Sequence, residues 1–233
     1  TTLLTMTTQR KIDNSLLKRF ERKENSNSRK VNSKEKRVYF LIVCEGEETE
    51  PNYFKAFERE LPPYTLDIQT WGTRCDPLGV VNAAIEFKKR SKKDSVWVVF
   101  DKDDFPAKNF NAAIKKAAAN QIKCAWSNEA FELWYILHFQ YLDTPLSRND
   151  YQRLLETEIN KKANKGKTPF KYNKNSKEMF QLLKKYGNQE QAIQRAIKLE
   201  QQFENQQYAT HNPCTLLYKL VEELNNPQIV FEK

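Results

Sequence analysis

Three acidic residues stand at the points where two apolar runs of the chain end. Glu45 follows the run 37–44, and Asp101 and Asp103 follow the run 95–100. In extended backbone, side chains two residues apart point to the same side, so the two aspartates can face one ion. Carboxylates without imidazoles nearby suit a hard, oxygen-preferring cation such as Mg²⁺ or Mn²⁺. We therefore expect Glu45, Asp101 and Asp103 to hold a divalent metal.

The two runs belong to an alternating pattern of strands and helices. Four β-rich apolar runs predict strands, at 37–44, 66–71, 95–100 and 122–126. Helical periodicity between them implies crossover connections, and so an α/β fold with a mostly parallel four-stranded sheet flanked by helices. Ligands of such sheets bind outside the carboxyl ends of the strands, which is where the three acids fall.

Beyond about residue 140 the pattern turns helical throughout. Helices are expected at 151–160, 177–186, 189–205 and 215–224. The chain then has three parts. They are a flexible basic arm over 1–36, an α/β catalytic domain over 37–140, and an all-helical extension over 141–233 that contains a lysine-rich loop.

The net charge of +9 gathers in two segments. Residues 1–36 carry ten Lys or Arg against four Asp or Glu, and residues 160–176 carry six lysines and no acid. Such segments can follow a phosphate backbone, although a solvated tail or loop explains either one equally well. The candidate nucleic-acid contacts are Lys161, Lys162, Lys165, Lys167, Lys171 and Lys174.

Several protein classes are excluded by what the chain contains. Its four cysteines have no paired spacing, which argues against a disulfide scaffold or a structural zinc site. Two histidines cannot build a three-imidazole centre, and with five glycines there is neither GxGxxG nor GxxxxGK[ST], so the chain is no P-loop ATPase by itself. No apolar window reaches the roughly 18–20 residues of a membrane span, and we expect a cytoplasmic protein.

The two strand-end motifs resemble a known signature. The segments 41–46 (LIVCEG) and 98–103 (VVFDKD) look like the Toprim pattern, in which a glutamate follows an early strand and a DxD follows a later one. More narrowly, 45–54 (EGEETEPNYF), 127–134 (SNEAFELW) and 212–216 (NPCTL) resemble the RloB/AbiLii family. These are Toprim-like proteins associated with restriction–modification loci and abortive infection.

The resemblance implies roles for individual residues. Asp101 and Asp103 would hold Mg²⁺, and Glu45 would ligate it or act as general acid or base. Glu132 could complete the catalytic site, with a structural role equally open. Glu50 and His138 are secondary candidates. For Glu50 a helix N-terminus is the favoured explanation, and for His138 a satisfied core histidine is.

We therefore expect a metal-dependent nuclease of antiphage defence, with RNA, tRNA in particular, as the preferred substrate. A DNA-nicking enzyme with the same site is the nearest alternative. A non-catalytic module that binds nucleic acid or protein within a defence complex is the other. The family setting also implies a separate ATPase as regulator, and the sequence leaves open whether the chain forms a homo-oligomer.

Overall fold

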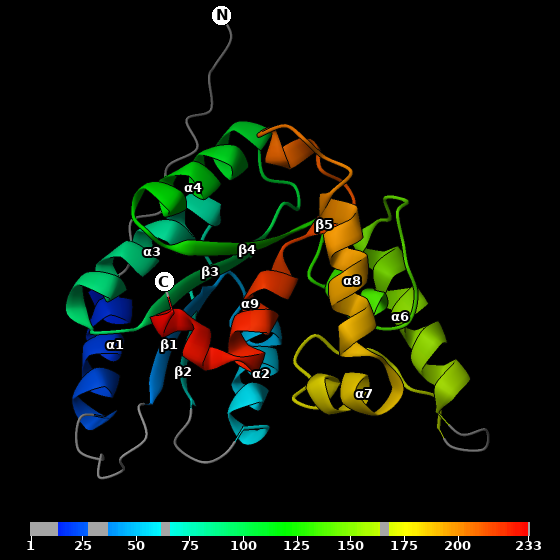
Figure 1. Cartoon of the computed structure of the whole chain (residues 1–233), viewed down its shortest axis with the longest axis horizontal. Helices are drawn as coiled ribbons and strands as arrows, with labels where there is room; N and C mark the ends of the chain where they lie inside the picture. Colours follow the sequence, from blue (N-terminus) through cyan, green and yellow to red (C-terminus); the bar gives the residue numbers. More distant parts are fainter. Residues whose placement is uncertain (1–13, 28–36, 62–65, 164–167, 233) are drawn as a thin grey trace, which may run out of the picture.

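The computed structural model describes residues 14–27, 37–61, 66–163 and 168–232. Within these residues, one five-stranded sheet forms the centre of the molecule, with the strand order β2-β1-β3-β4-β5 (Figure 1). The strands are β1 Val38–Cys44, β2 Leu66–Gly72, β3 Ser95–Asp101, β4 Lys123–Asn128 and β5 Cys214–Thr215. The first four are parallel to their neighbours, and β5 runs antiparallel to β4.

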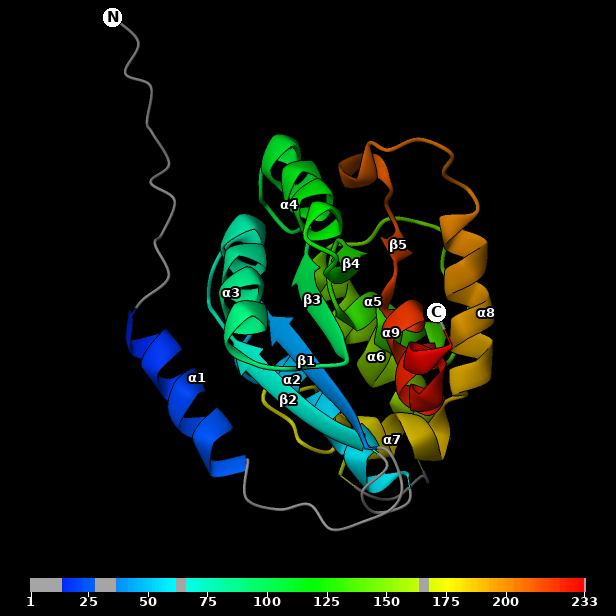
Figure 2. The ribbon, with the colours of Figure 1, turned by 60° about the vertical axis from the view of Figure 1, so that its left-hand side comes forward.

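Helices cover both faces of this sheet. The α-helices are α1 Asn14–Asn27, α2 Thr49–Lys55, α3 Pro77–Arg90, α4 Ala107–Ala119, α5 Glu132–Leu137, α6 Arg148–Lys162, α7 Met179–Tyr186, α8 Gln189–Glu200 and α9 Leu217–Asn225. Short 3-10 helices are η1 Ala56–Arg59, η2 Tyr208–Thr210 and η3 Pro227–Phe231. Figure 2 shows α3 and α4 on one face of the sheet and α5 and α9 on the other.

The central strands are the most apolar part of the chain. Every residue of β3 is buried, and β1 is buried except for a half-buried Tyr39. A strand buried on both faces carries a continuous apolar run rather than an alternating one, which is why both runs were recognisable in the sequence. The register pairs Cys44 with Val99, so β1 and β3 end side by side.

Part of the segment expected to be a flexible arm packs on the core. Phe20 of α1 is fully buried, and its ring stacks on Phe87 of α3 at a centroid distance of 4.2 Å. Trp71 lies against both rings. Residues 14–27 therefore form a helix attached to the α/β core, and the rest of the predicted arm lies outside the described residues.

The expectations of four strands and of an all-helical extension were wrong in one respect. The C-terminal part contributes β5, whose two residues pair with Ser127 and Asn128 of β4. The hydroxyls of Ser127 and Thr215 also hydrogen-bond, 3.0 Å apart. A two-residue strand is too short to produce a periodic pattern, so only its partner makes it recognisable.

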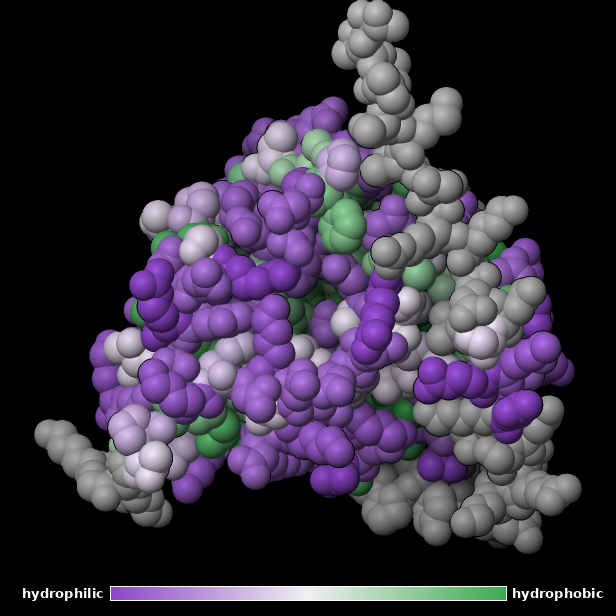
Figure 3. Space-filling view, turned by 180° about the vertical axis from the view of Figure 1, so that it is seen from behind, coloured by the Kyte–Doolittle hydropathy of each residue, from purple (hydrophilic) through white to green (hydrophobic). Residues whose placement is uncertain are grey.

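The outer surface is mostly polar on the face seen in Figure 3, where hydrophobic side chains show only in small separate areas. Among the described residues, no helix combines the length and apolar character that crossing a membrane requires.

Candidate functional site

Glu45 is placed by the ends of β1 and β3. Its backbone N–H donates to Val99 O at 2.9 Å, which extends the ladder between the two strands by one residue. Its carboxylate turns toward β3 and accepts a hydrogen bond from Asp101 N at 3.2 Å. The Glu45 carboxylate therefore reaches the backbone at the end of the neighbouring strand β3.

Asp101 is the last residue of β3, and its side chain is buried. Its Oδ2 accepts from the backbone N–H of Phe131 at 3.1 Å and lies 3.4 Å from Arg148 Nη2. Asp103 sits two residues on, with a positive φ of 39° that turns the chain away from the strand direction. Its carboxylate lies 3.2 Å from Arg148 Nη1. One guanidinium thus bridges both aspartates of the DxD pair.

Glu50 of α2 faces the same place. It is 6% exposed, and its carboxylate accepts from Gly46 N at 3.4 Å. The Glu50 carboxylate occupies the space into which a Cβ at position 46 would project, so Gly46 lets it lie against the backbone. Glu50 stands in the first turn of α2, as the favoured interpretation of the sequence has it, and it is also buried in the pocket lining.

Glu132 opens α5, directly after the loop that follows β4, and it is 3% exposed. Gln152 of α6 donates to it at 3.4 Å. The buried Tyr172 phenol lies close by, and its pKa is raised, first by burial and then by the Glu132 carboxylate.

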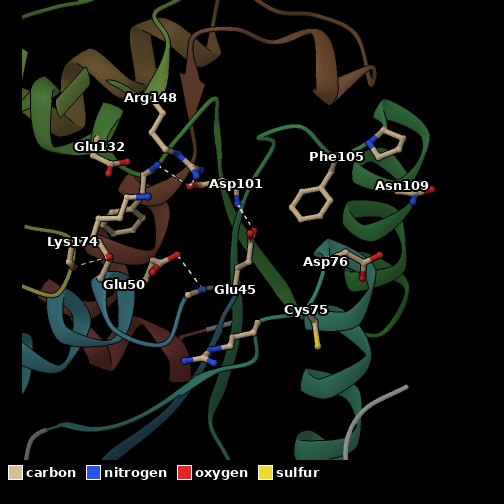
Figure 4. Close-up of a pocket in the computed structure, with 15 residues that line it drawn as sticks. Glu45, Glu50, Cys75, Asp76, Asp101, Phe105, Asn109, Glu132, Arg148 and Lys174 are labelled. Carbon is tan, nitrogen blue, oxygen red and sulfur yellow. Dashed lines mark hydrogen bonds and ion pairs between the residues drawn. The ribbon is translucent and has the colours of Figure 1, made fainter. Parts of the chain in front are cut away.

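One pocket of about 530 Å³, the size of a small-molecule or nucleotide site, is lined by Glu45, Glu50, Asp101, Glu132 and Arg148. Asp103 is not part of this lining and is connected to it through Arg148. Figure 4 shows two sides to the pocket. One side carries the acids together with Arg148 and Lys174, and the other carries an aromatic ring and polar side chains. Cys75, Asp76, Phe105 and Asn109 lie on the second side, and Arg74 and Pro106 also line the pocket.

The acidic side of the pocket has too few partners for its charge. The pKa of Glu45 is raised to about 8, chiefly by burial and then by the neighbouring Glu50 and Asp103, while the hydrogen bond from Asp101 N–H and the charge of Arg148 oppose the shift. Burial also raises the pKa of Asp101 well above its ordinary value, with Glu45, Glu50 and Glu132 as the next causes and Arg148 opposing them. The pKa of Glu50 is raised in the same way. Crowded carboxylates of this kind require a cation to stay ionised together.

The donor set fits a divalent metal by its chemistry. Hard oxygen ligands line the same pocket, and no imidazole or thiolate is needed. Within the described ranges, however, no three His, Cys, Asp or Glu side chains are already arranged as a metal-binding group. The guanidinium of Arg148 lies between Asp101 and Asp103, where a shared cation would bind. A metal at the DxD pair would therefore have to displace Arg148.

A family model described as RloB-like protein matches residues 40–224. The chain belongs to the RloB-like family. No curated protein and no solved structure matches it. The matched residues contain all of the pocket-lining side chains, so the site belongs to the part of the chain that the family shares.

The lysine-rich loop of this RloB-like protein reaches the pocket at one end. The hydroxyl of Thr49 donates to Lys174 O at 2.7 Å, which places the Lys174 side chain in the pocket lining. Two other lysines are paired with acids of α6, Lys161 with Glu158 at 2.5 Å and Lys171 with Glu156 at 3.0 Å.

The structure assigns no contact to the remaining predicted lysines. Lys162 ends α6 and is exposed. Lys165 and Lys167 lie outside the described residues. Of the predicted lysines that the structure describes, Lys174 is the one in the pocket lining.

His138 of the RloB-like chain is a core residue. It is 4% exposed, its Nδ1 lies 3.0 Å from Trp134 O, and burial lowers its pKa to about 4. It lines a different, smaller cavity from the one that holds the acids. The favoured interpretation from the sequence therefore agrees with its position.

Sequence reasoning missed Arg148 and Phe105. Ser147 caps α6 by accepting from Asp150 N, and this Ser-x-x-Asp pattern marks a helix start. That signal could have placed a basic residue in a first helical turn, but only the tertiary fold brings Arg148 to Asp101. Phe105 follows the DxD motif closely and carried no periodic signal of its own.

Proposed function

We propose that this RloB-like protein is a metal-dependent endonuclease that cleaves nucleic-acid phosphodiester bonds in antiphage defence. The observation that carries the proposal is the group of crowded carboxylates near the carboxyl ends of β1 and β3, whose pKa values are raised first by burial and then by one another's charge. Proteins seldom keep such an arrangement for stability, and perturbed carboxyls in a pocket mark functional sites.

In this proposal Asp101 and Asp103 hold Mg²⁺ or Mn²⁺, with Glu45 as a further ligand or as the acid–base group. The bound ion supplies Lewis-acid polarisation of the phosphodiester and stabilises the charge that develops on it. A carboxyl with a pKa of about 8, as Glu45 has, is suited to accept the proton of an attacking water or hydroxyl near neutral pH. Glu132 completes the acidic wall from the side of α5.

The cations of the pocket have a role toward the substrate. Arg148 Nε is buried and has no hydrogen-bond partner within the described residues. A guanidinium released from Asp101 and Asp103 by the metal would still lie at the pocket and can bind a phosphate through two N–H groups. Lys174 adds a second positive charge at the rim. Together they would orient the scissile phosphate over the acids.

The substrate we favour is RNA, and tRNA in particular. Membership of the RloB-like family supports a setting in phage defence, and the likeness of 41–46 and 98–103 to the Toprim signature supports nuclease chemistry. An always-active nuclease would kill its host, so we also propose that a separate ATPase restrains or activates the enzyme.

The test is a cleavage assay with purified protein, total tRNA and supercoiled plasmid, each with Mg²⁺, Mn²⁺ or EDTA. Asp101→Asn/Asp103→Asn is the site variant, and Asp67→Asn, which changes an aspartate paired with Arg37 away from the pocket, is the matched control. Metal-dependent tRNA fragments that disappear only in the site variant support the proposal. Plasmid nicking alone would select DNA as substrate.

If neither nucleic acid is cut, the same assay is repeated with the ATPase partner from the native locus. Protection against phage that persists in the site variant would contradict the enzyme and leave a non-catalytic module of a defence complex.

A further inference from the structure

The side of the pocket that carries Phe105 has no role in the proposed metal and phosphate chemistry. Its presence in the pocket therefore calls for another explanation. Phe105 is half-buried in the β3–α4 connection, and its ring faces the acids across the pocket (Figure 4). It does not belong to the hydrophobic core, and it makes no ring–ring contact within the part of the chain that the structure describes. A half-buried ring that lines the pocket and lies outside the packed core is available to a ligand.

Polar groups next to this ring are available as well. Asn109, in the first turn of α4, lines the pocket, and its side-chain amide makes no hydrogen bond within residues 66–163 or the other described ranges. Asp76 caps α3 by accepting from Gly79 N through Oδ1, at 2.8 Å, and it also lines the pocket. Pro106 adds a further apolar surface beside the ring.

We infer that Phe105, Asn109 and Asp76 form a nucleobase subsite, which stacks and hydrogen-bonds one base of the substrate strand next to the phosphate that Arg148 and Lys174 orient. An unpaired base is flat and apolar on its faces and polar on its edge, which matches a ring with an amide and a carboxylate at its side. A pocket of about 530 Å³ can hold one base together with its phosphate.

The inference rests on the proposed function, because it takes the bound strand to be the substrate, but it is tested without cleavage. In EDTA, the full chain is titrated by fluorescence anisotropy with a labelled ten-nucleotide oligo(A) RNA, its DNA counterpart, and a ten-unit abasic strand with the same phosphates. Phe105→Leu keeps the apolar volume and removes the ring. Phe105→Tyr keeps the ring. Tyr141→Ala removes a half-buried ring outside the pocket and serves as the control.

Stacking on an aromatic side chain supports binding strongly enough that Phe105→Leu should weaken oligo(A) binding about fivefold or more. Binding of the abasic strand should stay unchanged, Phe105→Tyr should bind as the unaltered protein does, and Tyr141→Ala should change neither. The stronger of the RNA and DNA arms identifies the source of the base. Equal weakening of base-carrying and abasic strands, or no weakening of either, overturns the subsite. If Phe105→Leu weakens binding of the base-carrying strands alone but the protein cleaves no nucleic acid, the nucleobase subsite stands and only the proposed nuclease activity is refuted.

Discussion

Two carboxylate sites lie at opposite ends of β3, and they are built in opposite ways. At the start of the strand, Glu223 is 6% exposed and accepts from Ser95 Oγ, from Trp97 Nε1 at 3.1 Å, and from Lys123 Nζ. At the end of the strand, Asp101 is just as buried, but its partners are long, at 3.1 Å from a backbone N–H and 3.4 Å from Arg148.

The difference separates a structural carboxylate from a functional one. Glu223 receives hydrogen bonds from Ser95, Trp97 and Lys123, and the Lys123 ammonium also balances its charge. The energetic cost of burying this carboxylate is therefore compensated. The acids near Asp101 have each other as neighbours, and their contacts exceed the 2.7–2.9 Å usual for charge-assisted hydrogen bonds. Burial alone therefore does not identify a site, whereas burial without compensation does.

Removing the charge of Glu223 should have the largest effect on stability. Glu223→Gln leaves Lys123 without its anion and is expected to cost about 2 kcal/mol of unfolding free energy, since hydrogen bonds to charged groups contribute about that much. Chemical denaturation measures the change. Glu222→Gln, at the exposed neighbouring position, is the control and should be close to neutral. Equal midpoints for both variants would refute the view of Glu223 as a compensated structural group.

Arg148→Ala should sharpen the contrast at the other end. Without the guanidinium, Asp101 and Asp103 lose the cation that competes for their oxygens, so Mn²⁺ should bind about tenfold more tightly, an effect sized by a charge pair at close range in a partly solvated site. Calorimetric titration measures the affinity. Arg153→Ala, which breaks an exposed pair on the same helix, is the control. Weaker metal binding in Arg148→Ala would show that Arg148 supports the metal site and does not compete with it.

Glu45→Gln should change the pH dependence of stability. The pKa of Glu45 in the folded protein is about 8, above its ordinary value of 4.5. The neutral carboxyl therefore contributes fully to the stability of the fold below pH 4.5, and this contribution to stability is lost as the pH rises through 8. Without metal, the variant should therefore be more stable than the unaltered protein at pH 9, by on the order of 1 kcal/mol, and equal to it near pH 4.5. Thermal unfolding midpoints of both proteins, measured in EDTA between pH 4.5 and pH 9, test this prediction. A constant difference at every pH would mean that Glu45 does not titrate as described.

Lys174→Ala should weaken nucleic-acid binding more than Lys161→Ala does. Lys174 lines the pocket, whereas Lys161 is paired with Glu158 on its own helix. We expect about a threefold loss and a salt-dependence slope lower by about one for Lys174→Ala, as for the removal of one phosphate contact. Anisotropy titrations at several salt concentrations measure both. Identical losses for the two variants would assign the contacts to the loop as a whole.

What the sequence could predict follows from how each signal arises. The apolar runs of β1 and β3 and the acids after them are local features, and the topology of parallel strands then brings Glu45 to Asp101. Arg148 and Glu50 reach the site from separate helices, and β5 forms only because β4 is beside it. Such relations depend on tertiary packing and leave no period in the sequence.

The most direct test of the central claim is the thermal unfolding midpoint measured with and without Mn²⁺, for the unaltered protein and for Asp101→Asn. A ligand that binds only the folded state raises its stability. Mn²⁺ should therefore raise the midpoint of the unaltered protein by several degrees, while Asp101→Asn should unfold at a higher temperature than the unaltered protein in EDTA and show little response to the ion. If both proteins respond to Mn²⁺ equally, or neither does, the uncompensated carboxylates at the end of β3 are not a metal site.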